Sequence, residues 1–214
     1  MLPASPMSER QFFETKARTQ VRDAIVTVEA QTSAELVVAV RRQASAYPHV
    51  DVAAGSLAGF VVLLLLLFLP WDFAVRWMPA EVLVAFLLGF AISSGFWAPK
   101  RWLVRNKSLH EATWRAACSV FHEKGISRTS GRNGVLVLVS MLERRVQVVA
   151  DIGIDTEALG PGWREAVDKM SAAVRRADLE GFIGALATLG PVLGAVMPRA
   201  EDDVNELPDE PDVS

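Results

Sequence analysis

The stretch that decides the fold is RNGVLVLVSMLERRVQVVADIGI, residues 132–154. Within it, residues 134–141 form an apolar run, which is typical of a central strand that is covered on both faces. Residues 144–152 follow after a short turn, so the two segments should pair as an antiparallel hairpin. Residues 33–40 are short, β-branched and bounded by polar residues, which predicts a third strand.

Four helices are predicted around these strands. The first covers residues 8–31, where apolar side chains recur at helical spacing after a capping box at Ser8. The last two follow the predicted hairpin. Pro161 begins one of them, and Asp178 caps the other, which Pro191 should end or kink.

The remaining helix is predicted between Ser108 and Gly125. Ser108 and Glu111 form a capping box, and Gly125 is a natural helix end. An apolar stripe at helical spacing consists of Trp114, Ala117, Cys118 and Phe121. We therefore expect Cys118 to be a core residue rather than a reactive nucleophile.

Two long segments, residues 52–71 and 82–99, contain no charged residue. As helices they would span about 27–30 Å, which is enough to cross the hydrocarbon core of a bilayer. Tryptophans stand near their ends, as in interfacial aromatic belts: Trp71, Trp77, Trp97 and Trp102. The sequence therefore predicts a transmembrane helical hairpin whose surroundings are the lipid bilayer.

The basic residues predict the orientation of this hairpin. Arg76 is the one basic residue in the connecting loop, whereas six flank the outer ends: Arg41, Arg42, Lys100, Arg101, Arg105 and Lys107. Because positive charge is retained on the cytoplasmic side, both termini should be cytoplasmic, with the protein in the inner membrane. Basic residues beside a span are explained by anionic headgroups, so we expect no nucleic-acid partner.

The predicted fold class is α/β: a small mixed-sheet α/β/α sandwich interrupted by the hairpin. Residues 1–50 and 100–197 would form the two parts of the sandwich, and residues 51–99 the insertion. Seven acids and two prolines fall within the last sixteen residues. Residues 198–214 are therefore predicted to be a disordered acidic tail.

Composition excludes several classes of site. The chain has 214 residues, a formal net charge of −3, one cysteine and three histidines. A single cysteine excludes an internal disulfide framework and any site with several cysteine ligands. The histidines are not at a metal-ligand spacing such as HExxH.

The candidate site lies at one end of the predicted hairpin. Asp151, Asp155 and Glu157 stand at the end of its second strand and in the following loop, where paired carboxylates could hold a metal or share a proton. Arg132 and Asn133 precede its first strand and would be adjacent. The alternative is ordinary loop chemistry, in which a carboxylate caps a turn and Asn133–Gly134 adopts left-handed backbone.

Three segments, residues 32–40, 121–126 and 132–154, resemble the TPM domain, a family named for thylakoid, photosystem-repair and nematode receptor-auxiliary proteins. The resemblance covers about residues 8–50 and 105–195, with the apolar segments as an insertion, and it is greatest to the bacterial membrane branch. It implies an α/β/α sandwich. Members of that branch often accompany LemA-type membrane proteins, so a LemA-like protein is an implied partner.

The resemblance also implies two functions. Some plant relatives are described as acid phosphatases, and some members bind a divalent cation near acidic loops. The family pattern usually has Asp before Asn-Gly, whereas this chain has Arg132, which would repel an ion and could instead bind Asp151 or Asp155. We therefore expect a non-catalytic accessory, assembly or interaction module that needs no cofactor. The alternative is a phosphatase in which Asp151, Asp155 and Glu157 hold Ca²⁺ or Mg²⁺.

Overall fold

The computed structural model describes residues 6–69, 75–95, 106–200 and 204–214. The chain divides into two compact units, Met1–Ala44 with His110–Ser214, called here the α/β unit, and Ser45–Leu109, called the helical unit. Some residues used in the membrane prediction lie outside the described ranges: Trp71, Trp97, Lys100, Arg101, Trp102 and Arg105.

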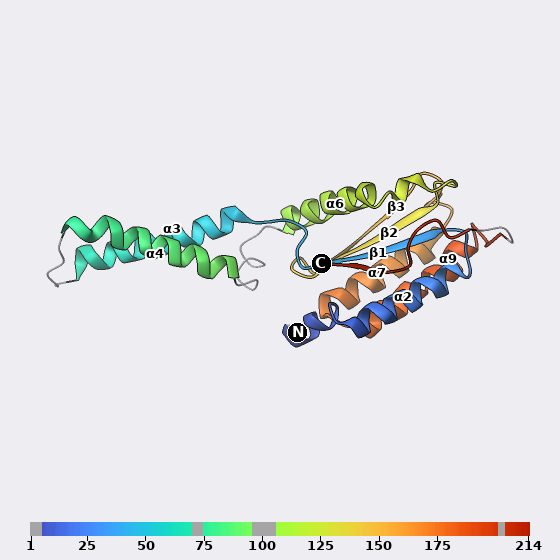
Figure 1. Ribbon diagram of the computed structural model, residues 1–214, viewed down its shortest axis with the longest axis horizontal. Helices are drawn as coiled ribbons and strands as arrows, with labels where there is room; N and C mark the ends of the chain where they lie inside the picture. Colours follow the sequence, from blue (N-terminus) through green and yellow to red (C-terminus); the bar gives the residue numbers. More distant parts are fainter. Residues whose placement is uncertain (1–5, 70–74, 96–105, 201–203) are drawn as a thin grey trace. The chain divides into compact units, whose positions relative to one another are not determined.

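The α/β unit contains a four-stranded mixed sheet with the order β3-β2-β1-β4 (Figure 1). The strands are β1 (Glu35–Arg41), β2 (Gly134–Ser140), β3 (Arg145–Ala150) and β4 (Asp212–Val213). β1 is parallel to both β2 and β4, and β2 is antiparallel to β3. The three predicted strands and the predicted β2–β3 hairpin are therefore confirmed.

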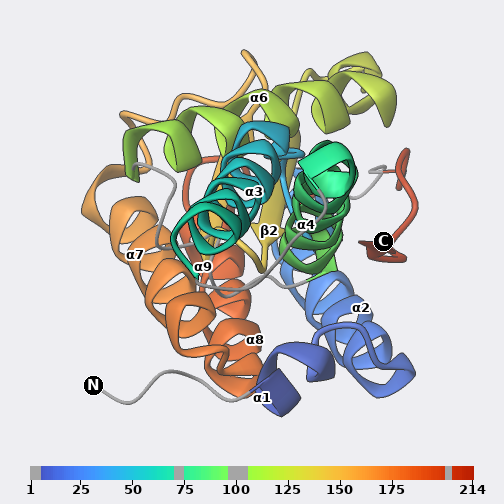
Figure 2. The same ribbon diagram turned by 90° about the vertical axis from the view of Figure 1, so that its left-hand side faces the viewer.

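Helices cover both faces of this sheet (Figure 2). One face carries α2 (Thr15–Glu29), α7 (Gly160–Arg176), α8 (Leu179–Ala187) and α9 (Leu189–Gly194). The other carries α6 (Asn106–Glu123). The unit is therefore the predicted α/β/α sandwich.

The period-2 alternation of the strands divides the core into two clusters. The cluster beneath the four helices contains alternate strand residues: Leu36, Val38, Val40, Val135, Val137 and Val139. The cluster beneath α6 contains the residues between them: Val37, Ala39, Leu136 and Leu138. Because β1 and β2 are buried on both faces, nearly all their side chains are apolar, and each buried Val or Leu stabilises the fold by about 1.5–3 kcal/mol.

The predicted first helix, residues 8–31, is interrupted. α1 (Pro6–Gln11) ends before Phe12, and α2 begins at Thr15. The interruption lets Phe12 enter the core, where it is 2% exposed and its ring lies 5.9 Å from that of Phe182. Burial of this large aromatic side chain thus favours an interrupted helix over a continuous one.

The predicted apolar face of α6 is only partly right. The helix begins at Asn106, so Ser108 lies inside it rather than capping it. Ala117 is buried as predicted, but Trp114 is 45% exposed and Cys118 is exposed. The residues of α6 that pack against the strands are Ala117 and Val120, together with the partly buried Ala116 and Phe121, so two of the four predicted residues, Ala117 and Phe121, lie on this face.

The acidic tail, predicted to be disordered, contributes β4 to the sheet. Asp212 and Val213 pair with Ala39 and Val40 of β1. The physical reason is that the unpaired edge of β1 offers backbone hydrogen bonds to an extended segment.

The predicted cap at Asp178 and the predicted break near Pro191 are both confirmed. The Asp178 carboxylate caps α8 by accepting a 2.9 Å hydrogen bond from the Gly181 N–H. The helical path breaks at Thr188, between α8 and α9. Pro191 explains the break, since it has no N–H to donate to the carbonyl four residues earlier.

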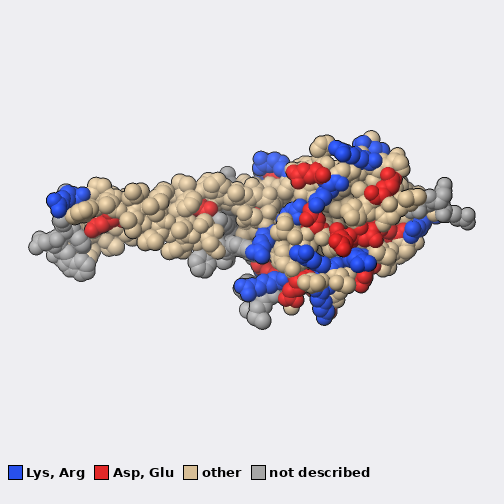
Figure 3. All heavy atoms as spheres, in the orientation of Figure 1, with Lys and Arg blue, Asp and Glu red and all other residues tan. Residues whose placement is uncertain are grey.

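The helical unit contains two antiparallel apolar helices, α3 (Pro48–Phe68) and α4 (Met78–Gly95), with the short helix η1 (Val75–Trp77) before α4. Both helices are long and apolar enough to cross a membrane. Figure 3 shows that their visible surface is almost free of charged side chains. A buried polar contact joins them: the Ser93 hydroxyl donates to the Asp51 carboxylate at 2.7 Å.

Small residues allow α3 and α4 to pack closely. A Cβ atom at Gly89 would lie 2.7 Å from the Cβ of Ala58, and one at Gly55 would lie 2.8 Å from the carbonyl oxygen of Phe86. Contact between backbones through glycine and alanine is the usual way in which helices associate in lipid.

We expect Gly89→Leu to destabilise the helical unit, because the new side chain would force α3 and α4 apart. Overpacking of this kind costs about 1–3 kcal/mol. Thermal unfolding of the detergent-solubilised chain measures the effect. Gly95→Leu is the matched control, since a Cβ at Gly95 meets no atom within 4 Å. Equal melting temperatures for the two variants would contradict the close packing.

Candidate functional site

The predicted site residues are partly brought together at one end of the sheet. Because β2 and β3 are antiparallel, the start of β2 lies beside the end of β3. The Asp151 N–H donates to the carbonyl of Gly134 at 2.9 Å, and the Gly153 N–H donates to the carbonyl of Arg132 at 3.0 Å. The predicted adjacency of Arg132 and Asp151 is confirmed.

Arg132 and Asp151 form an ion pair. An Arg132 Nη lies 3.0 Å from Asp151 Oδ1, and the other donates to the carbonyl of Ser127 at 2.7 Å. Asp151 Oδ1 also accepts a 2.8 Å hydrogen bond from the Ile152 N–H. The carboxylate side chain is 3% exposed and the guanidinium side chain 46% exposed, so a surface arginine neutralises a buried acid.

The backbone around this pair is tightly constrained. The left-handed residue is Arg132, with φ 51°, and not Asn133–Gly134, as the alternative of ordinary loop chemistry supposed. Gly134 is required for a different reason, since a Cβ there would lie 2.4 Å from the side chain of Ile126. At Gly153 a Cβ would lie 2.5 Å from the carbonyl oxygens of both Gly131 and Arg132. The two loops are therefore in backbone contact.

Asn133 connects β1 with β2. Its side-chain amide donates to the carbonyl of Ser33, and its own carbonyl accepts a 3.1 Å hydrogen bond from the Glu35 N–H. The Asn133 N–H is bound by the Thr129 hydroxyl at 3.2 Å. These contacts fix the loop in front of β2, as expected for a turn residue that bonds to backbone.

Asp155 and Glu157 do not converge on Asp151. Asp155 Oδ1 accepts hydrogen bonds from the N–H groups of Glu157 and Ala158, at 3.0 and 3.1 Å, while Glu157 is exposed. This is the turn-capping alternative. Within the described residues, no group of three or more His, Cys, Asp or Glu side chains could hold a metal ion.

These residues do not fit a divalent cation. Hard cations require several oxygens that converge on one point, whereas Asp155 is used by its own turn and Asp151 is paired with a guanidinium. Two buried acceptors, Asp151 Oδ2 and Asn133 Oδ1, have no hydrogen-bond partner among the described residues. Both oxygens can accept a hydrogen bond.

A second acidic group, which the sequence reasoning missed, lies beside β1. Glu29 Oε1 accepts a 2.9 Å hydrogen bond from the Leu36 N–H, and the buried Glu35 accepts from the Leu207 N–H at 3.3 Å. Burial raises the pKa of Glu29 to about 7; the Leu36 N–H opposes the rise, whereas Glu35 and Asp209 add to it. Helical spacing alone gives no signal for this group.

Glu29→Gln should therefore stabilise the α/β unit at pH 8 and have little effect below pH 4.5. The folded-state pKa lies above the ordinary value of 4.5, so stability is lost as pH rises from about 4.5 to about 7. Glutamine keeps the acceptor for Leu36 and cannot ionise. Melting temperatures across this range test the prediction, with Asp168→Asn, an exposed carboxylate on α7, as control. A gain that is equal at all pH values would contradict it.

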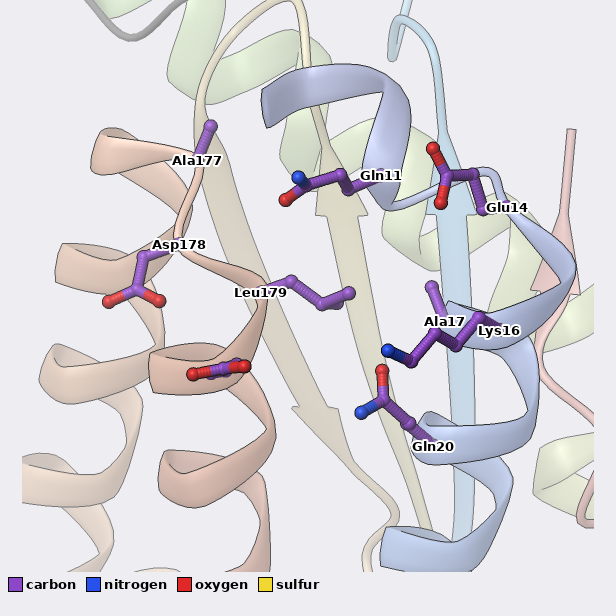
Figure 4. Close-up of a pocket in the computed structure, with 9 residues that line it drawn as sticks. Gln11, Glu14, Lys16, Ala17, Gln20, Ala177, Asp178 and Leu179 are labelled. Atoms are coloured by element: carbon purple, nitrogen blue, oxygen red, sulfur yellow. The ribbon is translucent and has the colours of Figure 1, made fainter. Parts of the chain in front are cut away.

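A pocket of about 330 Å³ lies between the start of α2 and the α7–α8 corner (Figure 4). Lys16 and Gln20 point from α2 toward Leu179 across its opening. Its lining contains none of the predicted site residues and consists of Gln11, Glu14, Lys16, Ala17, Gln20, Ala177, Asp178, Leu179 and Glu180.

Comparison with known proteins adds information on the fold. No family model matches the chain, and no curated protein matches it. Among solved structures, the chain is similar to the NMR structure of the BA42 protein from the psychrophilic bacterium Bizionia argentinensis. The two share 16% sequence identity, the alignment covers 94% of each chain, and the TM-score is 0.56. A likeness at this identity concerns the fold and not the function.

Proposed function

We propose that this protein is a membrane-anchored, non-catalytic TPM-type module that acts as an accessory, assembly or interaction factor for another membrane protein. The observation that carries the proposal is the pair of apolar helices inserted in the sequence between β1 and α6. A LemA-like protein is the partner that the sequence resemblance suggests.

The exposure of the apolar helices supports membrane insertion. Only 22% of the apolar stretch of α3 and 6% of that of α4 are buried, whereas a helix in a soluble core is mostly buried. Large side chains on both are more than half exposed, including Leu57, Phe68, Leu83 and Ile92. Water-soluble proteins rarely expose contiguous apolar surface of this extent.

The chemistry of the candidate site supports a non-catalytic role. A metal-dependent phosphatase would need the carboxylates of Asp151, Asp155 and Glu157 around one ion. Here the Asp151 carboxylate binds Arg132, and Asp155 caps its own turn. The same contacts rigidify two loops, which suits a docking surface.

The proposed topology places both termini and the α/β unit in the cytoplasm, with the α3–α4 connection on the far side. Cys118 is exposed and is the one cysteine of the chain, so it reports the location of the α/β unit without mutation. In intact cells, a membrane-impermeant maleimide should leave Cys118 unlabelled. In a Cys118→Ser background, Val75→Cys should label and Asn205→Cys should not. The reverse pattern would contradict this orientation.

The accessory role is tested by affinity purification of the intact, detergent-extracted chain from its own membrane. We expect co-purification of a membrane protein in stoichiometric amount. The control is the chain in which a Gly/Ser linker replaces residues 51–99. Recovery of the chain alone, together with hydrolysis of a phosphomonoester that depends on Ca²⁺ or Mg²⁺, would instead support the phosphatase alternative.

A further inference from the structure

The acidic tail lies along the outer edge of β1 (Figure 1). Only two of the seven residues of β1 pair with it, Ala39 with Asp212 and Val40 with Val213. Further back along this edge the Leu36 N–H is bonded by the Glu29 carboxylate, so an added extended segment would pair with β1 between Val37 and Arg41.

Cationic side chains hold the end of the tail. The Asp212 carboxylate lies 2.8 Å from an Nη of Arg41 and 2.6 Å from the Nζ of Lys124. These two cations come from the end of β1 and from the residue after α6, so the fold brings them together at one point of the edge. They form a subsite that selects a carboxylate.

A second carboxylate subsite binds the tail six residues before Asp212. The Glu206 carboxylate accepts from the Ser130 N–H at 3.0 and 3.1 Å and from the Ser130 hydroxyl at 2.6 Å. The neighbouring Leu207 packs against the core cluster beneath α6. The edge therefore recognises a pattern of three residues. An acid (Glu206 in the tail) is followed at once by an apolar residue (Leu207), and a second acid (Asp212) comes five residues after the apolar one.

The tail pairs with β1 only near its end. The Ser214 N–H donates to the carbonyl of Val40, and the Arg42 N–H donates to the carbonyl of Ser214, so the backbone groups of Ser214 face β1. The tail bends at Leu207 and again at Glu210, so this strand pairing does not continue back toward Pro208.

We propose that the outer edge of β1 is the docking site for an extended acidic segment of a partner protein, which adds parallel to β1 and displaces the tail. The partner segment carries the pattern described above. This proposal rests on the accessory function and names its docking surface. The tail then acts as a built-in competitor that keeps the edge covered until the partner is present.

The test measures binding of a fluorescent peptide with the sequence of residues 204–214 to the purified full chain in detergent. The intact chain should bind it weakly. Asp212→Asn, which weakens the attachment of the chain's own tail, should increase affinity about tenfold, because the apparent affinity is reduced by the fraction of edges already covered. A chain that ends at Ala200 should bind at least as tightly and provides a second variant.

Peptide variants test the carboxylate subsite. A peptide with Asp212→Asn should bind the Asp212→Asn chain about fivefold more weakly than the unaltered peptide, since it loses the charged contacts to Arg41 and Lys124. A peptide with Glu210→Gln loses the charge of an exposed carboxylate and is the matched control, so its affinity should not change. Arg41→Gln should weaken binding of every peptide.

Several outcomes would overturn the proposal. Equal binding of a scrambled peptide, unaltered binding to Arg41→Gln, or no binding to either tail variant while it unfolds cooperatively would each do so. If the intact chain dimerises by exchanging tails, with dimers lost in Asp212→Asn, the occupant is a second copy and not a partner protein. None of these results depends on co-purification of a membrane protein, so the accessory function is judged separately.

Discussion

Replacing residues 51–99 by a short Gly/Ser linker should move the protein from the membrane fraction to the soluble fraction, with a single cooperative unfolding transition. The four strands and both core clusters lie outside the replaced segment. The apolar surface of α3 and α4 is removed with it. A flexible linker of this composition adds little constraint, so the sandwich should keep its stability.

A matched control establishes that the soluble product is the same fold. Phe182 is fully buried, and truncating a buried Phe to Ala costs about 3–5 kcal/mol. Phe182→Ala in the linker variant should therefore lower its melting temperature by roughly 10 °C, at 2–4 °C per kcal/mol for a domain of this size. A product that aggregates with several linker lengths, or whose transition does not respond to Phe182→Ala, would contradict an independent α/β unit.

The sequence predicted the elements whose signal is local. β2 is a run of apolar residues because it is covered on both faces, and the hairpin follows because only a short turn separates it from β3. The two apolar helices could be predicted in the same way, since their length and lack of charge do not depend on any other part of the chain. The structure shifts their limits by a few residues, to Pro48–Phe68 and Met78–Gly95.

The errors arose where contacts between distant residues decide the structure. The tail is acidic and contains two prolines, yet it is ordered by Arg41, Lys124 and the open edge of β1. The same reason applies to Phe12, which leaves its helix to contact Phe182, 170 positions further along the chain. Neither the contact of the tail with β1 nor that of Phe12 with Phe182 could be predicted from composition or from the spacing of apolar residues.

In the candidate site, too, the local contacts could be predicted and the distant ones could not. The pairing of Arg132 with Asp151 follows from the antiparallel hairpin, which brings the two positions side by side whatever else the chain does. The environment of Glu29 could not be predicted, because its raised pKa comes first from burial and only then from Glu35 and Asp209. Burial of a helical glutamate is a property of the assembled sheet edge.

Saturating Ca²⁺ or Mg²⁺ should raise the melting temperature of the full chain very little. The guanidinium of Arg132 already supplies positive charge 3.0 Å from Asp151, and an added cation would be repelled by it. A true site filled at a hundredfold excess over its dissociation constant would add about 2.7 kcal/mol. That gain corresponds to roughly 5–10 °C for a protein of this size.

Arg132→Asp should reverse this behaviour. Without metal, the variant loses the partner of a buried carboxylate and gains a second negative charge beside it, which should cost about 1–3 kcal/mol or more. With Ca²⁺ or Mg²⁺, the introduced carboxylate and that of Asp151 offer oxygen ligands at one point, so part of the stability should return. Arg164→Asp, the same change at an exposed position of α7, is the control and should show no response to the cations.

The opposite result would change the functional conclusion. If the unmutated chain were stabilised by several degrees by a divalent cation, and Asp155→Asn abolished that gain, then Asp155 would have to leave its turn and join Asp151 around the ion. The loop contacts from Asp155 to Glu157 and Ala158 would then describe one of two states of the site. Under that outcome the metal-dependent phosphatase, and not the accessory module, would be the function that the site supports.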